Sequence, residues 1–152
     1  HLGIGQHLNI GCIRTYMTRH GNGPLPTEAK LGLKDVGNPT NKYQGEMRYG
    51  YFDEVLFKYA LANAGDKVDY IALSHCDETQ KYVCKEYFGD GKVIKSLPKP
   101  ACIEDQIELC NLIKDVKPIF EATPLSINIP LLYKSYGPRA SDKEKIGNFH
   151  GN

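Results

Sequence analysis

The sequence predicts an α/β protein, part of a mostly parallel sheet flanked by helices. Two stretches with apolar residues at helical spacing, 51–65 and 103–116, alternate with short apolar segments at 67–74 and 129–138. The first pair, a helix leading into a buried strand, is half of an α/β unit. The chain has 152 residues, 41% of them hydrophobic and 24% charged, which is enough for one domain with a real core.

Glycine and proline signals divide the first half of the chain. Residues 9–17 mix β-branched and aromatic side chains and predict one strand, whereas residues 31–42 are rich in Gly, Pro, Asn and Asp and predict irregular structure. The helix predicted from residue 51 ends at Gly65, which is a suitable stop. The expected inner face of this helix consists of Phe52, Val55, Leu56, Tyr59 and Ala60.

The second half of the chain contains three further predicted helices. Residues 79–88 predict a short helix, and residues 103–116 predict a longer amphipathic one. Residues 139–149 predict a terminal helix, because Ser141 can serve as the N-cap and Glu144 completes a capping-box pattern. The expected inner positions of the helix over 103–116 are Ile103, Ile107, Cys110 and Ile113.

The overall composition argues against several classes of protein. The formal net charge is +1, so no strong field favours nucleic acid, and the longest apolar runs of about five residues are far short of a membrane span of about 20. No signal peptide is visible. The five cysteines form no C-x-x-C pair, and we expect reduced thiols in a cytoplasmic protein. They are Cys12, Cys76, Cys84, Cys102 and Cys110.

Three polar loops follow apolar segments: "TRHGNGPLPTE" over 18–28, "SHCDE" over 74–78 and "SYGPR" over 135–139. Glycines let a ligand approach backbone amides, and prolines keep such loops from collapsing. In open α/β sheets, ligands bind at the carboxyl ends of the strands. These loops therefore suit a nucleotide, and ordinary turns are the alternative interpretation.

Two side chains in these regions have a functional and a structural interpretation. Asp77 follows a predicted buried strand, where its carboxylate can accept the N1 hydrogen and the 2-amino group of a guanine edge. The alternative is that Asp77 caps the next helix. Arg48, three residues past Gly45, carries a guanidinium fork suited to a carboxylate or phosphate, and a surface arginine is the alternative. Asp53 and Glu54 are interpreted as helix N-terminal charges.

Five segments together resemble one family. "IRTYMTRHGNGPLPTE" is similar to a segment of adenylosuccinate synthetases, and "NKYQGEMRYGYFD" resembles the aspartate loop of their short, archaeal and phage-like branch. "DYIALSHCDE" resembles the strand that recognises the triphosphate's base in that family. "KPIFEATP" and "SYGP" resemble two later family motifs, and the five matches follow the family's order over roughly residues 8–140.

This resemblance implies a ligase with P-loop-GTPase-like character. Such an enzyme couples L-aspartate to the six-position of inosine monophosphate (IMP), driven by GTP, through a 6-phosphoryl intermediate and with Mg²⁺ on the phosphates. Residues 1–152 would be a single C-terminal portion of that domain, and the full-length protein is expected to be a homodimer. No nucleic-acid or membrane partner is expected.

The resemblance also implies site residues. Aspartate would be bound by Gln44, Gly45 and Arg48, and the purine monophosphate by His20, Gly21 and Gly23. The triphosphate's base would be bound by His75, Cys76, Asp77, Ser135, Tyr136 and Gly137.

Departures from the family pattern leave alternatives open. Glu46 and Met47 stand where bacterial members carry arginines, and His75 stands where many members have lysine. A phage-type enzyme using dGMP with ATP or GTP is therefore an alternative, as is a non-catalytic nucleotide-binding module. The chain opens with His1, and no "W-G-D-E-G-K-G" phosphate loop or family catalytic residue lies within it. We expect a fragment that is inactive by itself.

Overall fold

A computed structural model describes residues 7–33, 40, 42–65 and 67–148. The chain folds as two compact units. Unit 1 comprises His1–Thr15, Ala64–Thr79 and Ser126–Asn152, and unit 2 comprises Tyr16–Asn63 and Gln80–Leu125. Residues 1–6 and most of the predicted irregular stretch 31–42 lie outside the described residues.

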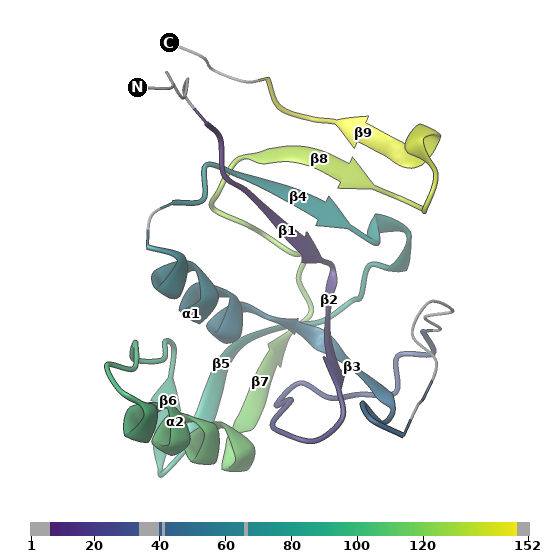
Figure 1. Ribbon diagram of the computed structural model, residues 1–152. Helices are drawn as coiled ribbons and strands as arrows, with labels where there is room; N and C mark the ends of the chain where they lie inside the picture. The colour runs from purple at the N-terminus through teal and green to yellow at the C-terminus, as the bar shows by residue number, and fades with distance from the viewer. Residues whose placement is uncertain (1–6, 34–39, 41, 66, 149–152) are drawn as a thin grey trace. The chain divides into compact units, whose positions relative to one another are not determined.

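Unit 1 is built on a mostly parallel sheet, as the sequence predicts. Its strand order is β1-β4-β8-β9, with β1, β4 and β8 parallel and β9 antiparallel to β8 (Figure 1). Because the parallel strands run the same way, their carboxyl ends share one edge of the sheet. The strands are β1 (Ile10–Arg14), β4 (Tyr70–Ser74), β8 (Leu131–Ser135) and β9 (Lys143–Lys145).

Unit 2 contains a five-stranded sheet and two helices. Strands β2 and β3 are antiparallel, β3 and β5 pair in parallel over a short overlap, and β5 pairs antiparallel with both β6 and β7. The α/β class is therefore confirmed. The strands are β2 (Tyr16–His20), β3 (Met47–Asp53), β5 (Val83–Gly89), β6 (Lys92–Ile94) and β7 (Lys117–Glu121), and the helices are α1 (Glu54–Ala64) and α2 (Ile103–Asp115).

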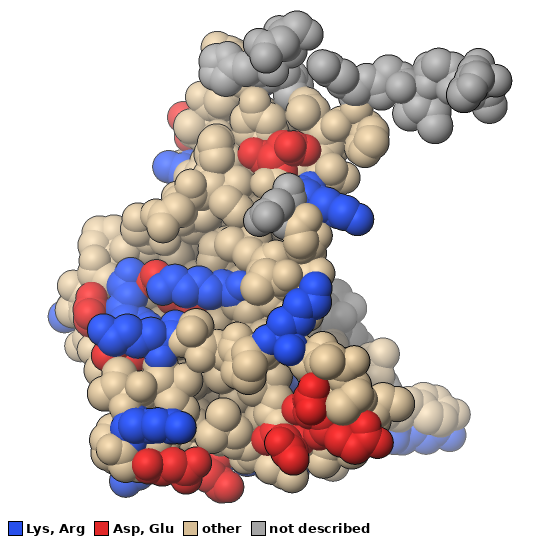
Figure 2. Space-filling model, turned by 90° about the vertical axis from the view of Figure 1, so that its left-hand side faces the viewer, with Lys and Arg blue, Asp and Glu red and all other residues tan. Residues whose placement is uncertain are grey.

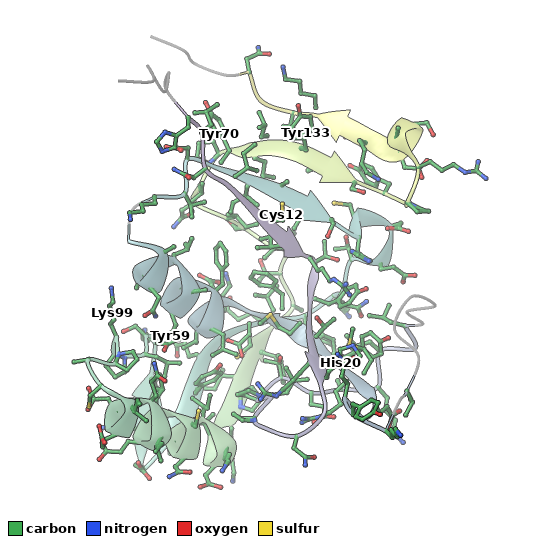
Figure 3. All side chains as sticks on the ribbon, viewed as in Figure 1. Cys12, His20, Tyr59, Tyr70, Lys99 and Tyr133 are labelled. Atoms are coloured by element: carbon green, nitrogen blue, oxygen red, sulfur yellow. The ribbon has the colours of Figure 1, made fainter. Side chains whose placement is uncertain are left out.

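The core of unit 2 forms where α1 and α2 pack on β5. On α1, Val55 is fully buried, and Leu56 and Tyr59 pack against the same cluster, which confirms the predicted inner face at these three positions. Figure 3 labels Tyr59 on α1. The prediction is wrong for Ala60, which is exposed, and Phe52 is buried but lies on β3. On β5, Cys84 and Tyr87 are fully buried, and burial raises the pKa of the Cys84 thiol to about 12. Within the described residues no helix is long and apolar enough to cross a bilayer.

The start of α1 is fixed by a fully buried carboxylate. Asp53 accepts the backbone N–H of Leu56 at 3.0 Å, which is an N-cap bond, and its other oxygen accepts the Tyr87 hydroxyl at 2.5 Å. Glu54 pairs with Lys58 and Lys85 at the edge of the helix. The interpretation of Asp53 and Glu54 as helix N-terminal charges is confirmed.

The strand predicted over 9–17 is instead two strands, β1 and β2, which belong to different sheets. The break falls at Thr15, a buried residue whose amide donates to the carbonyl of Ser74 and whose hydroxyl donates to the carbonyl of His75. These are long-range contacts. Because the break has neither glycine nor proline, the local pattern could not reveal it.

Two predicted helices are wrong. Residues 79–88 form mostly strand β5, because pairing with β3, β6 and β7 takes up its backbone hydrogen bonds while α1 and α2 pack on Cys84 and Tyr87. The predicted terminal helix is a single 3-10 turn, Ala140–Asp142, followed by β9. The backbone N–H of Arg139 donates to the Asp142 carboxylate at 2.8 Å, which closes the chain into a turn.

The long amphipathic helix is confirmed as α2, but its inner face is rotated. Of the four predicted inner positions, Ile113 is buried, as is Leu109, whereas Ile103 and Ile107 are 69% and 56% exposed and Cys110 is also exposed. Both sets of positions have helical spacing, so the sequence offers two apolar stripes. Packing of α2 against β5 and β6 selects the second one.

Candidate functional site

In unit 2, the structure brings two predicted glycine loops together. The loop after β2 approaches the segment before β3, where the backbone N–H of Gly21 donates to the carbonyl of Glu46 at 3.2 Å. Gly21 has φ 61, and a Cβ there would lie 2.7 Å from the carbonyl oxygen of Gln44. Only glycine allows this approach. The predicted monophosphate-binding and aspartate-binding residues therefore form one cluster, the glycine-loop cluster, which consists of His20, Gly21, Gly23, Gln44, Gly45 and Arg48. Figure 3 labels His20 on β2.

Arg48 holds this cluster together. Its Nη1 donates to the carbonyls of Gly21 and Gly23 at 2.9 and 2.8 Å. Its Nε and Nη2 donate to the two carboxylate oxygens of Glu28 at 2.9 and 2.5 Å. The hydrogen bonding between the Glu28 carboxylate and the Arg48 guanidinium is the main cause of two shifts: it lowers the pKa of Glu28 and raises the pKa of Arg48. Arg48 is thus held by four hydrogen bonds, and its assignment to aspartate stays a prediction.

A second arginine completes the fixation of the loop. Arg19 donates through Nε to the carbonyl of Asn22 at 3.0 Å. The carbonyls of three successive residues, 21 to 23, are thus held by guanidinium groups, which gives this loop a defined shape without regular secondary structure.

Gly23 is the most constrained residue of the loop. It has φ 116, and a Cβ there would overlap the guanidinium of Arg19, whereas Gly32, with φ 72, has open space around it. We expect Gly23→Ala and Gly32→Ala both to lower the free energy of unfolding by about 1 kcal/mol, because alanine is strained at positive φ. Gly23→Ala should lower the free energy of unfolding by about 1 kcal/mol more than Gly32→Ala does, because the added Cβ displaces Arg19 and breaks its hydrogen bond to the carbonyl of Asn22. Equal urea denaturation curves for the two variants would show that Arg19 does not shape the loop.

A pocket of about 380 Å³ opens beside this cluster. The loop residues 23–26 and the Glu28–Arg48 pair form part of its lining, and Ile113, Lys114 and Val116 at the end of α2 form the rest. One carboxylate and two cations thus meet an apolar surface. This volume and lining suit a small polar ligand.

In unit 1, the other predicted loops meet at the carboxyl edge of the parallel sheet. Leu73 on β4 is in register with Lys134 on β8, so "SHCDE" and "SYGP" leave the sheet side by side. The Sγ of Cys76 donates to the carbonyl of Leu73 at 3.5 Å, and a backbone hydrogen bond with Ser135 also acts on its thiol. His75, Cys76, Asp77, Ser135, Tyr136 and Gly137 therefore form a second cluster, the sheet-edge cluster.

Backbone contacts fix both loops of the sheet-edge cluster. His75 has φ 58, and its carbonyl accepts hydrogen bonds from the Thr15 hydroxyl at 2.7 Å and the Glu78 amide at 3.0 Å. The amide of Tyr136 donates to the carbonyl of Asp142 at 2.9 Å, and Lys143 donates to the carbonyl of Gly137 at 2.5 Å. These contacts fix the backbone of each loop separately, and the register of β4 and β8 sets the two loops side by side.

Asp77 stands exposed within a 3-10 turn, Cys76–Glu78. The N-cap position of this turn is His75, and the helix predicted to follow is a strand, so the capping alternative for Asp77 is wrong. An exposed carboxylate on a fixed backbone is available to two parallel hydrogen-bond donors.

The chain matches a known protein family. The family model for adenylosuccinate synthetase matches residues 3–123, which is most of the chain. The chain belongs to the adenylosuccinate synthetase family. Adenylosuccinate synthetases are ligases of purine biosynthesis.

Several adenylosuccinate synthetases are similar to this chain. The protein of Wolbachia sp. subsp. Brugia malayi is 29% identical over 174 residues, which covers 92% of this chain and 38% of the relative. The Thermoplasma acidophilum protein is 33% identical over 74% of this chain, and the Prochlorococcus marinus protein is 34% identical over 76% of it. The chain spans only 25% and 26% of these two relatives.

The adenylosuccinate synthetase family implies Mg²⁺, but the described side chains do not fit a protein cage for it. Among them, no group of three or more His, Cys, Asp or Glu residues lies close enough to hold a metal ion. We therefore assign no Mg²⁺ ligand to these residues, and no step proposed below depends on one.

Sequence reasoning missed Arg19 and Glu28, which shape the glycine-loop cluster. Both stand within the quoted motif "TRHGNGPLPTE", but their contacts depend on the register of β2 and β3, which sets Arg19 opposite Arg48. The available signal was a charged residue on each side of the glycine turn, although Arg19 bonds to the carbonyl of Asn22 and Glu28 pairs with Arg48.

Proposed function

We propose that the chain is the C-terminal portion of an adenylosuccinate synthetase-type ligase. The complete enzyme would join L-aspartate to the six-position of IMP with GTP hydrolysis, in the cytoplasm and as a homodimer, with Mg²⁺ supplied on the phosphates. The observation that carries the proposal is the glycine-loop cluster, where Arg48 joins the two family loops through the carbonyls of Gly21 and Gly23. Because the chain spans 38% or less of the relatives described above, catalytic groups would come from outside it.

In this proposal the glycine-loop cluster binds the purine monophosphate and L-aspartate. The 6-oxygen of the purine is first phosphorylated, and the aspartate amine then attacks C6 and displaces phosphate, which leaves far more easily than hydroxide. The role of His20, Gly21 and Gly23 is to line the ribose. The role of Gln44, Gly45 and Arg48 is to orient the aspartate carboxylates, so that the amine approaches C6 from one face of the ring. Of the five N–H donors of Arg48, four bond to Glu28, Gly21 and Gly23, which leaves one on Nη2 for this role.

The sheet-edge cluster would bind the base of GTP. The Asp77 carboxylate offers two acceptors to the N1 hydrogen and the 2-amino group of guanine. Adenine has no hydrogen on N1 and no 2-amino group, so the Asp77 carboxylate would face the N1 lone pair, which is a second acceptor, and no hydrogen bond would form. His75, Cys76, Ser135, Tyr136 and Gly137 would contact the base from the two flanking loops, whose backbones are fixed as described.

Competitive titration of the 152-residue chain tests this assignment. We expect GTP to bind at least tenfold more tightly than ATP, a difference of about 1.4 kcal/mol, and IMP to bind more tightly than dGMP. A preference for dGMP would instead identify the phage-type enzyme that makes a 2-amino product. Binding of GTP without IMP or L-aspartate would favour a non-catalytic nucleotide-binding module.

A further inference from the structure

We propose that Glu28 is a positioning residue of the glycine-loop cluster. It holds the guanidinium of Arg48 so that this side chain fixes the backbone carbonyls of the loop over 21–23. The consequence for ligand binding rests on the proposed function, whereas the positioning of the loop does not.

The hydrogen bonds of Arg48 show how the three parts are linked. The Nε–Nη2 edge faces Glu28 through two parallel bonds, a fork geometry that fixes both the place and the plane of the guanidinium. The remaining nitrogen, Nη1, then points at the carbonyls of Gly21 and Gly23. A single carboxylate thereby orients two peptide groups that lie 27 and 25 residues from Arg48 in the sequence.

Glu28 is itself mounted on a fixed backbone. It forms a β-bridge with Gly50 of β3, and its amide donates to the carbonyl of Leu25 at 2.9 Å. The neighbouring carbonyl of Thr27 accepts the amide of Tyr51 at 3.0 Å. A Cβ on Gly50 would lie 2.7 to 2.9 Å from atoms of Thr27, so this close backbone approach requires glycine. The carboxylate therefore has a rigid support.

Charge gives a second reason for a carboxylate at this place. Arg19 and Arg48 are directly opposite each other in the register of β2 and β3. Like charges in such cross-strand positions destabilise the pair. Glu28 supplies a negative charge beside Arg48, and its pKa is lowered chiefly by the Arg48 hydrogen bond, so it is ionised at neutral pH.

Fixing the carbonyls also fixes the amides that follow them. In a trans peptide the N–H points away from the carbonyl of the same peptide group. Arg48 therefore determines the direction of the Asn22 amide through the carbonyl of Gly21, and Arg19 does the same for the Gly23 amide. The next peptide has no N–H because residue 24 is proline. The two orientable amides are the groups that a bound nucleotide would meet on the loop.

Backbone ¹⁵N relaxation of the ligand-free chain tests the positioning role directly. We expect the order parameters of Asn22 and Gly23 to fall from about 0.85 in the native chain to below about 0.6 in Glu28→Gln. Arg48→Lys keeps the charge but not the fork and should have the same effect. The matched control is Glu86→Gln, which removes the Glu86–Lys95 ion pair elsewhere in unit 2 and should leave the loop unchanged.

Binding measurements then separate positioning from the proposed function. We expect IMP to bind about tenfold more weakly to Glu28→Gln than to Glu86→Gln. If the native chain binds no IMP but the loop still loosens in Glu28→Gln, the proposed function fails and the positioning role stands. Unchanged order parameters in both Glu28→Gln and Arg48→Lys would overturn the positioning role. So would tighter binding of L-aspartate by Glu28→Gln, because Glu28 would then be a competitor for Arg48.

Discussion

Asp53→Ala is expected to lower the free energy of unfolding by about 3 kcal/mol. The substitution removes the N-cap bond to Leu56, which is typically worth about 1 kcal/mol, and leaves the hydroxyl of fully buried Tyr87 without its acceptor at a cost of about 2 kcal/mol. Urea denaturation of the 152-residue chain, followed by circular dichroism, measures the loss. A loss below about 1 kcal/mol would contradict the view that this carboxylate organises the core of unit 2.

Asp53→Asn is the matched control, because it keeps the shape and cannot ionise. Its side chain can still cap Leu56 and bond to the Tyr87 hydroxyl. Burial raises the pKa of Asp53, against the opposing effect of the Tyr87 hydrogen bond, so the folded state binds more protons than the unfolded state above the ordinary value of about 4. The contribution of Asp53 to stability therefore declines as pH rises through this window. We expect Asp53→Asn to lack that decline.

Asp77→Asn is expected to weaken GTP binding by about 2 kcal/mol, roughly 30-fold. Asparagine offers one acceptor and one donor where guanine presents two donors, so one donor of the base would face the amide NH₂. Xanthine triphosphate has an N1 hydrogen and a 2-oxygen, which match the asparagine amide. The variant should therefore prefer xanthine triphosphate over GTP, and the native chain should prefer GTP.

Glu78→Gln is the control for this substitution. It removes an equal charge from the next residue of the same turn and should leave the order of the two nucleotides unchanged. If Asp77→Asn kept the native preference for GTP, the base would not be read by this carboxylate.

The elements predicted best are those whose local pattern and tertiary environment agree. Helix α1 and strands β4 and β8 were recognised because apolar spacing, glycine stops and burial all favour the same structure. Strand β5 was mistaken for a helix because its pairing with β3, β6 and β7 and the packing of α1 and α2 on Tyr87 are contacts between segments far apart in the sequence. The switch of sheets at Thr15 depends on contacts 60 residues away.

In the candidate site, too, local motifs were predictable from the sequence and long-range contacts were not. Family motifs predicted which loops carry it, and the structure places the predicted residues in two clusters, one in each unit. The sequence did not predict the Glu28–Arg48 pair or the role of Arg19, because both depend on strand register. The role of a single side chain is hardest to predict from sequence when several partners suit it. Arg48, for example, bonds to one carboxylate and two backbone carbonyls.

The central claim is that the chain carries two separate nucleotide-binding clusters of an adenylosuccinate synthetase-type ligase. Amide chemical-shift mapping of the ¹⁵N-labelled 152-residue chain at millimolar nucleotide tests it most directly. IMP is predicted to shift the amides of residues 20–23 and 44–48, and GTP those of residues 75–77 and 135–137. Shifts of both nucleotides on one cluster, or on neither, would contradict the claim.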